Sequence, residues 1–134
     1  METPMKPIVA LQDYHLSEMK DGHVVLETKV DTTSLNYYGN AHGGFLFTLS
    51  DQVAGLVLLS QGVEGVTLQG SINYLKAGHL GDCLLVKGRS LHAGRTTRLV
   101  ETEVFNQDHH LLCRASFTMF VTSRGQKKDF TIVD

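Results

Sequence analysis

Several residue types that would assign a protein to a particular class are scarce in this 134-residue sequence. The two cysteines, Cys83 and Cys113, do not form a CxxC pair, so the sequence carries neither a disulfide framework nor a zinc signature. The sequence also lacks a large excess of charge of either sign, because it has 12 Lys and Arg residues and 14 Asp and Glu residues. A chain without a basic surface is not expected to bind nucleic acid or an anionic membrane.

Long apolar runs are absent as well. The most apolar stretch, residues 45–59, is interrupted by Thr48, Ser50, Asp51 and Gln52, and we expect it to be too short and too polar to span a bilayer. The N-terminal segment has no basic region followed by an apolar run, which a signal peptide would need. These absences predict a soluble, cytoplasmic protein with no membrane partner.

The length predicts one domain, residues 1–134, with an ordered body of about residues 11–123 and loosely held ends. At this size roughly two-thirds of the surface of the unfolded chain can be buried, so a core forms without disulfides or metals.

Alternation of apolar and polar residues with a period of two predicts strands over most of the chain. Ala93-Gly94 and residues 106–110 provide tight connections, and short connections between neighbouring strands predict an antiparallel sheet. Cys83 and Cys113 fall on strand positions that we expect to face inward, as buried structural thiols. The predicted strands are residues 23–30, 66–74, 83–92, 97–106 and 111–121.

In the segment 66–74 the alternation places five residues on one face of the strand and the residues between them on the other. The first set is Val66, Leu68, Gly70, Ile72 and Tyr74, and the second is Thr67, Gln69, Ser71 and Asn73.

Residues 44–60 break the alternation. Their length of about 17 residues favours a helix, because strands usually run for three to ten. Apolar residues on almost every side indicate a buried helix, and Gly62 and Gly65 follow as stop signals. The sequence therefore predicts an α+β fold, in which one long central helix is wrapped by a curved antiparallel sheet of five or six strands.

One face of this helix carries a carboxylate. A helical wheel places Leu46, Leu49, Val53, Leu56 and Val57 on an apolar face. Asp is almost never fully buried unless it is paired, so Asp51 is either a solvated or hydrogen-bonded structural residue or a functional carboxylate. The opposite stripe consists of Gly44, Thr48, Asp51, Gln52 and Gly55.

The chain enters the helix through two glycines, Gly43 and Gly44. The first N–H groups of a helix lack intrahelical partners and carry the positive end of its dipole. Glycine lets a ligand oxygen approach these groups, as an oxyanion hole requires. An ordinary glycine turn into a helix is the alternative that the pair alone leaves open.

Taken together, Asn36, Gly39, His42-Gly43-Gly44 and Asp51 resemble the signature of PaaI-type hotdog-fold acyl-CoA thioesterases, with Asp nine residues after the His and Asn six before it. Further segments are similar to that family, and the resemblance spans roughly residues 31–121. These segments are residues 71–78, 81–82, 93–96 and 104–107.

The resemblance implies a hotdog fold and the hydrolysis of an acyl-CoA to free acid and coenzyme A. It gives Asp51 the role of nucleophile or general base and makes the Gly43 backbone N–H the oxyanion donor. Asn36 would position the carbonyl or the water, His42 would orient the loop and the thioester, and Thr67 would hold the water.

The same resemblance implies substrate contacts and an assembly. Family members pair their sheets edge to edge, so a homodimer or a dimer of dimers (a homotetramer) is expected, with Asp51 facing a loop of the other subunit. No cofactor or metal is implied, because coenzyme A is part of the substrate and the seven histidines form no HExxH motif. Arg89 and Arg98 are further candidates for the phosphates of coenzyme A. The implied substrate-binding residues are Gly44, Ser71, Tyr74, Lys76, Arg95 and Thr96.

Two rival functions use the same fold. A non-catalytic acyl-CoA-binding or sensing module would have no need of Asp51. A hotdog dehydratase would pair a His base with an acid and carry a proline-rich loop that this sequence lacks. A serine-hydrolase fold is excluded, because no GxSxG motif occurs.

Overall fold

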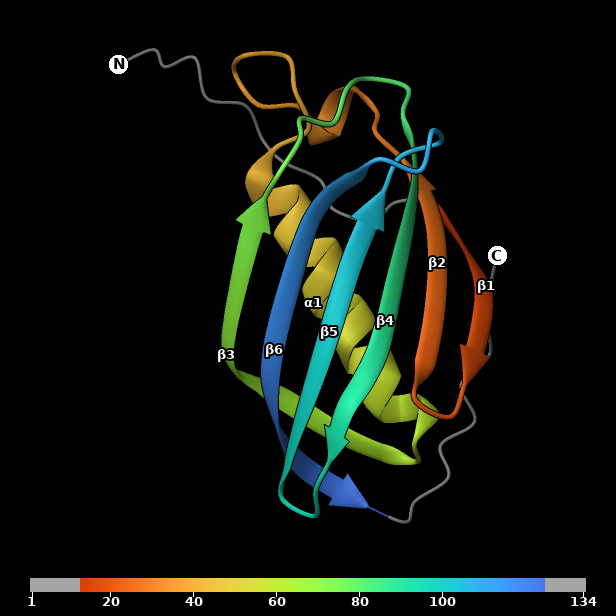
Figure 1. Ribbon diagram of the computed structural model, residues 1–134, viewed down its shortest axis with the longest axis vertical. Coiled ribbons are helices and arrows are strands. Elements are labelled where there is room, and N and C mark those ends of the chain that lie inside the picture. The colour runs from red at the N-terminus through yellow and green to blue at the C-terminus, as the bar shows by residue number, and fades with distance from the viewer. Residues whose placement is uncertain (1–12, 125–134) are drawn as a thin grey trace.

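A long helix lies across one face of a six-stranded antiparallel sheet (Figure 1). The computed structural model describes residues 13–124. The strand order in the sheet is β1-β2-β4-β5-β6-β3, so β1 and β3 form its two edges. The elements are β1 (Tyr14–Lys20), β2 (His23–Lys29), the short 3-10 helix η1 (Thr32–Ser34), α1 (Gly43–Ser60), β3 (Val63–Tyr74), β4 (Cys83–Ala93), β5 (Thr97–Phe105) and β6 (Leu111–Arg124).

The predicted α+β architecture with a sheet of five or six strands is confirmed, and the sheet has six strands, five of which were assigned to residue ranges. The strand that was not predicted, β1, has a register irregularity between Leu16 and Glu18, which interrupts the alternation that would identify it. Its hairpin with β2 turns at Asp21-Gly22, where Gly22 has a φ of 81°. Asp-Gly is a strong hairpin signal, so the turn itself was readable in the sequence. The predicted start of the ordered body lies outside the described residues.

Helix α1 supplies the centre of the core. The residues predicted for its apolar face pack against the sheet, and Leu49, Val53 and Val57 are fully buried. The sheet approaches so closely that a Cβ atom on Gly88 of β4 would lie 2.6 Å from a methyl carbon of Val53. Gly44 and Gln52 on the opposite stripe are exposed. The sheet therefore covers one side of α1 and leaves the stripe with Asp51 open.

Helix α1 has 18 residues and a mean hydropathy of 1.4, and by length and composition alone it could cross a membrane. The prediction that this segment is too short and too polar was therefore wrong. Its role is shown by its packing, since eight of its residues are buried against the sheet of the same chain.

Edge strand β3 departs from the predicted alternation. Register irregularities lie between Glu64 and Gly65 and between Thr67 and Gln69, and the strand is strongly bent (Figure 1). Ahead of the second irregularity Thr67 pairs with the buried Met119, so Thr67 faces the helix. Val66, predicted to share a face with Tyr74, instead pairs with the exposed Phe120, whereas Tyr74 pairs with the buried Cys113.

The two thiols also differ from each other. Cys113 is buried, as predicted, whereas Cys83 is exposed. In β4 the inward positions are Leu84, Val86 and Gly88. Cys83 therefore lies one residue out of register with the inward face, and a shift of one residue reverses the face of a strand position.

Candidate active site

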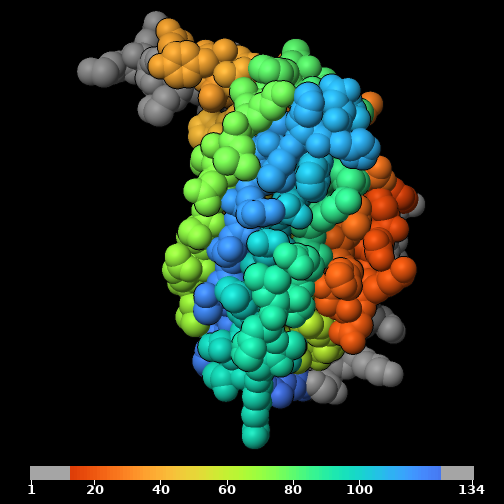
Figure 2. Space-filling view, viewed as in Figure 1, coloured from red at the N-terminus to blue at the C-terminus, as the bar shows by residue number. Residues whose placement is uncertain are grey.

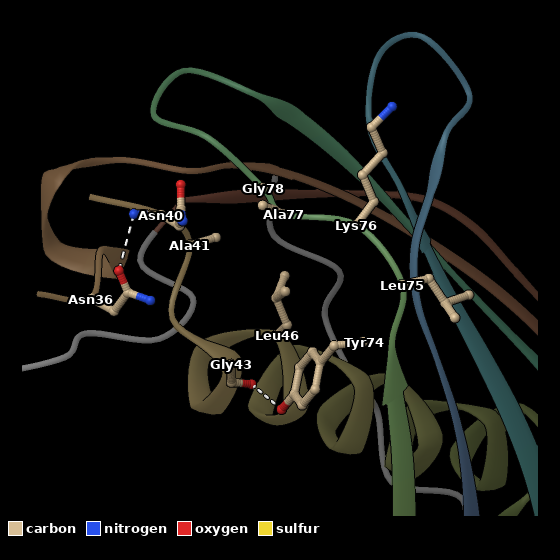
Figure 3. Close-up of a pocket in the computed structure, with 10 residues that line it drawn as sticks. All are labelled: Asn36, Asn40, Ala41, Gly43, Leu46, Tyr74, Leu75, Lys76, Ala77 and Gly78. Carbon is tan, nitrogen blue, oxygen red and sulfur yellow. Dashed lines mark hydrogen bonds between the residues drawn. The ribbon is translucent and has the colours of Figure 1, made fainter. Parts of the chain in front are cut away.

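A pocket of about 370 Å³ opens at the N-terminal end of α1. It lies between the loop that follows η1, the first turns of α1 and the chain that leaves β3, so three separate segments form its walls (Figure 3). The loop after η1 projects from the body of the molecule (Figure 2). The lining residues are Asn36, Asn40, Ala41, Gly43, Leu46, Tyr74, Leu75, Lys76, Ala77 and Gly78.

Asn36 folds the loop on which it lies. Its side-chain oxygen accepts hydrogen bonds from the backbone N–H groups of Tyr38 and Asn40, both at 3.0 Å. The side-chain nitrogen is turned toward the pocket (Figure 3). Asn36 therefore shapes the loop with its oxygen and leaves its N–H₂ group, which can only donate, for a ligand.

The helix begins at Gly43 and is capped by the residue before it. The Nδ1 atom of His42 accepts a hydrogen bond of 2.9 Å from the N–H of Gly44. An accepting Nδ1 carries no proton, so the neutral ring has its N–H at Nε2. The N–H of Gly43 has no acceptor among residues 13–124. It remains a free donor at the positive end of the helix dipole.

Asp51 lies two turns further along α1, on the open stripe, and is half-buried. The hydroxyl of Thr67 donates a hydrogen bond of 2.6 Å to the Oδ1 atom of Asp51, and this hydroxyl oxygen also lies 3.4 Å from the sulfur of Met119. The second oxygen of Asp51, Oδ2, has no hydrogen-bond partner in the described part of the chain. The carboxylate is thus held by one oxygen and available through the other.

Two of the predicted substrate-binding residues, Tyr74 and Lys76, line the pocket. A third, Gly44, does not line it but follows the lining residue Gly43 in the first turn of α1. Tyr74, from the end of β3, donates a hydrogen bond of 2.7 Å from its hydroxyl to the carbonyl oxygen of Gly43. Lys76 lies at the rim, where its Nζ atom is 2.8 Å from Nδ1 of His110 and points away from the pocket floor (Figure 3).

The other three are not brought to the pocket within one chain. Ser71 is three positions before Tyr74 and therefore lies on the opposite, outer face of β3. Arg95 and Thr96 are in the hairpin between β4 and β5, at the far end of the sheet from the start of α1 (Figure 1). The substrate contacts assigned to these residues stay predictions.

The two further arginine candidates have partners inside the chain. Arg98 is buried and donates to the carbonyl oxygen of Gly94 and to the side chain of Gln61, at 2.7 and 2.9 Å. Arg89 donates to Glu101 at 2.8 Å on the outer face of the sheet. Neither lines the pocket.

Sequence reasoning missed several lining residues, and one of the contacts at the rim. Ala77 and Gly78 lie three and four residues after the end of the predicted strand. The N–H of Ala41 donates to the carbonyl oxygen of Gly78 at 2.8 Å, which joins two walls of the pocket. His110 was assigned only to a turn. Nothing local in the sequence could show that the turn after β5 lies beside Lys76, because that depends on the order of strands.

Within residues 13–124, no group of three or more His, Cys, Asp and Glu side chains is placed to hold a metal ion.

Comparison with known proteins identifies the family to which this chain belongs. The family described as the thioesterase superfamily matches residues 38–113, which is more than half of the chain. The chain belongs to the thioesterase superfamily. The matched range contains α1, β3 and β4, and therefore Gly43, Asp51 and Thr67, whereas Asn36 lies just ahead of it.

Relatives of this thioesterase-superfamily chain include the acyl-coenzyme A thioesterase PaaI of Escherichia coli (strain K12). The two are 33% identical over 89 residues, which cover 66% of this chain and 64% of that protein, just under two thirds of its length. The PaaI-type hotdog family, the hotdog fold and the prediction of a thioesterase enzyme are confirmed by these matches.

Solved structures are more similar still. A hypothetical thioesterase protein from Streptococcus pneumoniae TIGR4, crystallised with coenzyme A, is 55% identical with a TM-score of 0.90, covering 91% of this chain and 98% of that one. Two further structures of that protein carry alanine in place of an aspartate and of a threonine. A Streptococcus mutans UA159 protein bound to acetyl-CoA is 50% identical with a TM-score of 0.84, covering 89% of this chain and 96% of that one.

Proposed function

We propose that this protein hydrolyses an acyl-CoA thioester to a free acid and coenzyme A, using side chains and backbone of its own and no cofactor or metal. The observation that carries the proposal is the hydrogen bonding of the Asp51 carboxylate. A carboxylate on a core helix is held at one oxygen by Thr67, while its other oxygen is free, on the one stripe of α1 that the sheet leaves open. A structural carboxylate would be expected to have both oxygens satisfied.

The chemistry divides between two groups. The N–H of Gly43 donates to the thioester oxygen and stabilises the negative charge that develops there when the carbonyl carbon becomes tetrahedral. Asp51 either attacks that carbon itself or takes a proton from the water that attacks it. Collapse of the intermediate breaks the carbon–sulfur bond, and coenzyme A leaves as the thiolate and takes up a proton. On the general-base route the acid is then released directly. On the nucleophilic route a mixed anhydride of the acyl group with Asp51 remains, and water hydrolyses it to the free acid and the carboxylate.

The relatives support coenzyme A thioesters as the ligand and Asp51 and Thr67 as a functional pair. The Streptococcus pneumoniae protein was crystallised with coenzyme A, and the Streptococcus mutans protein with acetyl-CoA. The aspartate and threonine replaced by alanine in the former protein are separated by sixteen positions, as Asp51 and Thr67 are here.

Helix geometry supports a site that is shared between two copies of the chain. Gly43 and Asp51 are eight residues apart on α1, which at 1.5 Å per residue separates them by about 12 Å along the axis. A donor and a nucleophile at that separation do not act on the same carbonyl carbon. We propose that Gly43 of one copy meets Asp51 of another, in a dimer or a dimer of dimers.

The edge strand β3 fits this assembly. Its outer edge has no strand partner within the described sheet, and the apolar side chains of Val66 and Leu68 are exposed on it. An exposed apolar edge strand is a ready site for pairing with another chain.

A hydrolysis screen tests the function. The full chain should release free thiol from at least one of four classes of acyl-CoA, with aromatic, short, medium and long acyl groups. We expect turnover with one class to exceed the others, since the pocket has a fixed width. Binding of coenzyme A without thiol release from any class would contradict the proposal and would favour the non-catalytic acyl-CoA-binding module.

A further inference from the structure

The peptide unit that joins Gly43 to Gly44 is held at both of its polar atoms. The hydroxyl of Tyr74 donates to its carbonyl oxygen at 2.7 Å, and Nδ1 of His42 accepts from its N–H at 2.9 Å. The two side chains come from different elements, since Tyr74 ends β3 and His42 caps α1. Figure 3 shows the hydrogen bond from Tyr74 to Gly43. We call this arrangement the peptide clamp.

The clamp acts where the backbone has the most freedom. Two consecutive glycines carry no side chains that would restrict their φ and ψ angles, so the first turn of α1 would otherwise be the least constrained part of the helix. A side chain at Gly43 cannot supply the missing restraint, because its Cβ atom would lie only 3.0 Å from the hydroxyl oxygen of Tyr74. In addition to the helical hydrogen bonds of α1, these two side-chain hydrogen bonds therefore restrain the orientation of this turn.

The direction of the free Gly43 N–H depends on the same turn. This N–H belongs to the preceding peptide, which shares the Cα atom of Gly43 with the clamped one. When the clamped peptide is fixed, fewer orientations remain for the preceding peptide and therefore for its N–H. An oxyanion donor contributes most when it is already aimed at the position of the developing charge, because no reorganisation is then needed during the reaction.

We propose that Tyr74 is a positioning residue, whose hydroxyl fixes the Gly43–Gly44 peptide and thereby aims the N–H of Gly43 at the thioester oxygen. The role of that N–H rests on the proposed function; the clamp itself does not. Burial of the ring, with a smaller contribution from Cys113, raises the pKa of Tyr74 above its ordinary value. The hydroxyl is therefore a donor throughout the neutral range.

The Tyr74→Phe variant removes only the hydroxyl. We expect kcat for acyl-CoA hydrolysis to fall about tenfold, less than the hundredfold or more for loss of an oxyanion donor, because the N–H remains but is poorly aimed. KM and the Kd for coenzyme A, which has no thioester carbonyl, should stay within about twofold of the wild type. Tyr38→Phe is the matched control, since Tyr38 lies in the loop between η1 and α1, is 82% exposed and its hydroxyl has no hydrogen-bond partner among the described residues.

A second measurement does not depend on activity. The carbonyl-carbon NMR resonance of Gly43 and the nitrogen resonance of Gly44 should both shift in Tyr74→Phe and stay unchanged in Tyr38→Phe, because the clamped peptide loses a donor. If these resonances do not move, the clamp does not exist in solution and the inference is overturned.

The two measurements separate the inference from the function on which it rests. Unchanged kcat in Tyr74→Phe, or a loss of kcat that is matched by a weaker Kd for coenzyme A, would show that Tyr74 does not act through Gly43. A wild-type protein that hydrolyses no acyl-CoA would overturn the proposed function, and the NMR shifts would still decide whether the clamp forms.

Discussion

The face of β3 on which Thr67 lies depends on a register irregularity in the strand, which a regular alternation of residues does not predict. Simple alternation along residues 66–74 placed Thr67 on the face opposite Gly70 and Tyr74. The register shift between Thr67 and Gln69 reverses the face within two residues, so Thr67 and Tyr74 both reach α1 from one strand. Bulges often lie beside functional sites for this reason. The resemblance pointed to Thr67, but the residue pattern alone could not have.

Replacing Thr67 tests its hold on Asp51. In Thr67→Ala both oxygens of the carboxylate become free to rotate, and we expect kcat to fall about tenfold because the orientation of the reacting group is lost. Thr67→Ser keeps the hydroxyl and should recover most of the activity. Steady-state kinetics of the two variants checks this, and an inactive Thr67→Ser variant would indicate that the methyl group, through packing, is what matters.

Cys113 gives a prediction about pH. Burial raises the pKa of its thiol from 9.0 to about 12, partly offset by a hydrogen bond with Ser50. Above pH 9 the unfolded chain loses this proton while the folded chain keeps it, so stability is complete below pH 9 and declines as the pH rises toward 12. The decline reaches about 4 kcal/mol at the upper end of that range.

Urea unfolding between pH 8 and pH 11 measures this decline, which should be less steep in Cys113→Ala. The exposed Cys83 supplies a control, since Cys83→Ala should keep the wild-type slope. Thiol labelling of the native protein at pH 8 should modify Cys83 rapidly and Cys113 only after unfolding. Rapid labelling of both thiols would contradict the buried position of Cys113.

At the scale of elements, the helix was the most predictable part of the fold. Its length, its apolar side and its glycine stops are all local properties of residues 44–62, and the observed helix begins one residue earlier because His42 caps it. Strands β2, β4, β5 and β6 were also predicted from alternation. Strand β1 was missed because its irregularity masks the period, and the strand order depends on contacts between residues far apart in the chain.

Because α1 and β4 are in close contact, we expect the addition of a single methyl group at Gly88 to lower the stability of the fold. A Cβ atom in Gly88→Ala would lie 2.6 Å from Val53 and 2.9 Å from Val57, both within a fully packed core. We expect the free energy of unfolding to fall by about 1–3 kcal/mol, as overpacking of a core usually costs. Urea unfolding measures it, with Lys87→Ala, on the outer face of the same strand, expected to cost less than about 1 kcal/mol.

At the scale of the whole molecule, the proposed mechanism needs two groups that do not meet within one chain. The proposed oxyanion donor, the N–H of Gly43, lies at the start of α1, and the carboxylate of Asp51 lies two turns away on an open face. The sequence alone predicted a shared site only through the family resemblance. The structure adds the physical reason, which is the rigid separation of about 12 Å along a continuous helix.

Sedimentation tests this assembly. The wild-type chain should sediment as a dimer or larger. Leu68→Glu places a charge on the exposed edge strand β3, and we expect it to yield monomers that have lost most of their activity but remain folded, since Leu68 is 59% exposed in the single chain. Tyr14→Glu, on the opposite edge strand β1, should keep both assembly and activity. An active monomer would contradict the shared site.

The most direct test of the account compares the wild type with Asp51→Ala in acyl-CoA hydrolysis and in coenzyme A binding. Loss of the nucleophile or base should lower kcat/KM by about a thousandfold or more, as removal of central catalytic groups does. The Kd for coenzyme A should stay within about twofold of the wild type, because the free thiol does not need the carboxylate. Hydrolysis by Asp51→Ala at a rate near that of the wild type would contradict the assignment of Asp51 and the mechanism built on it.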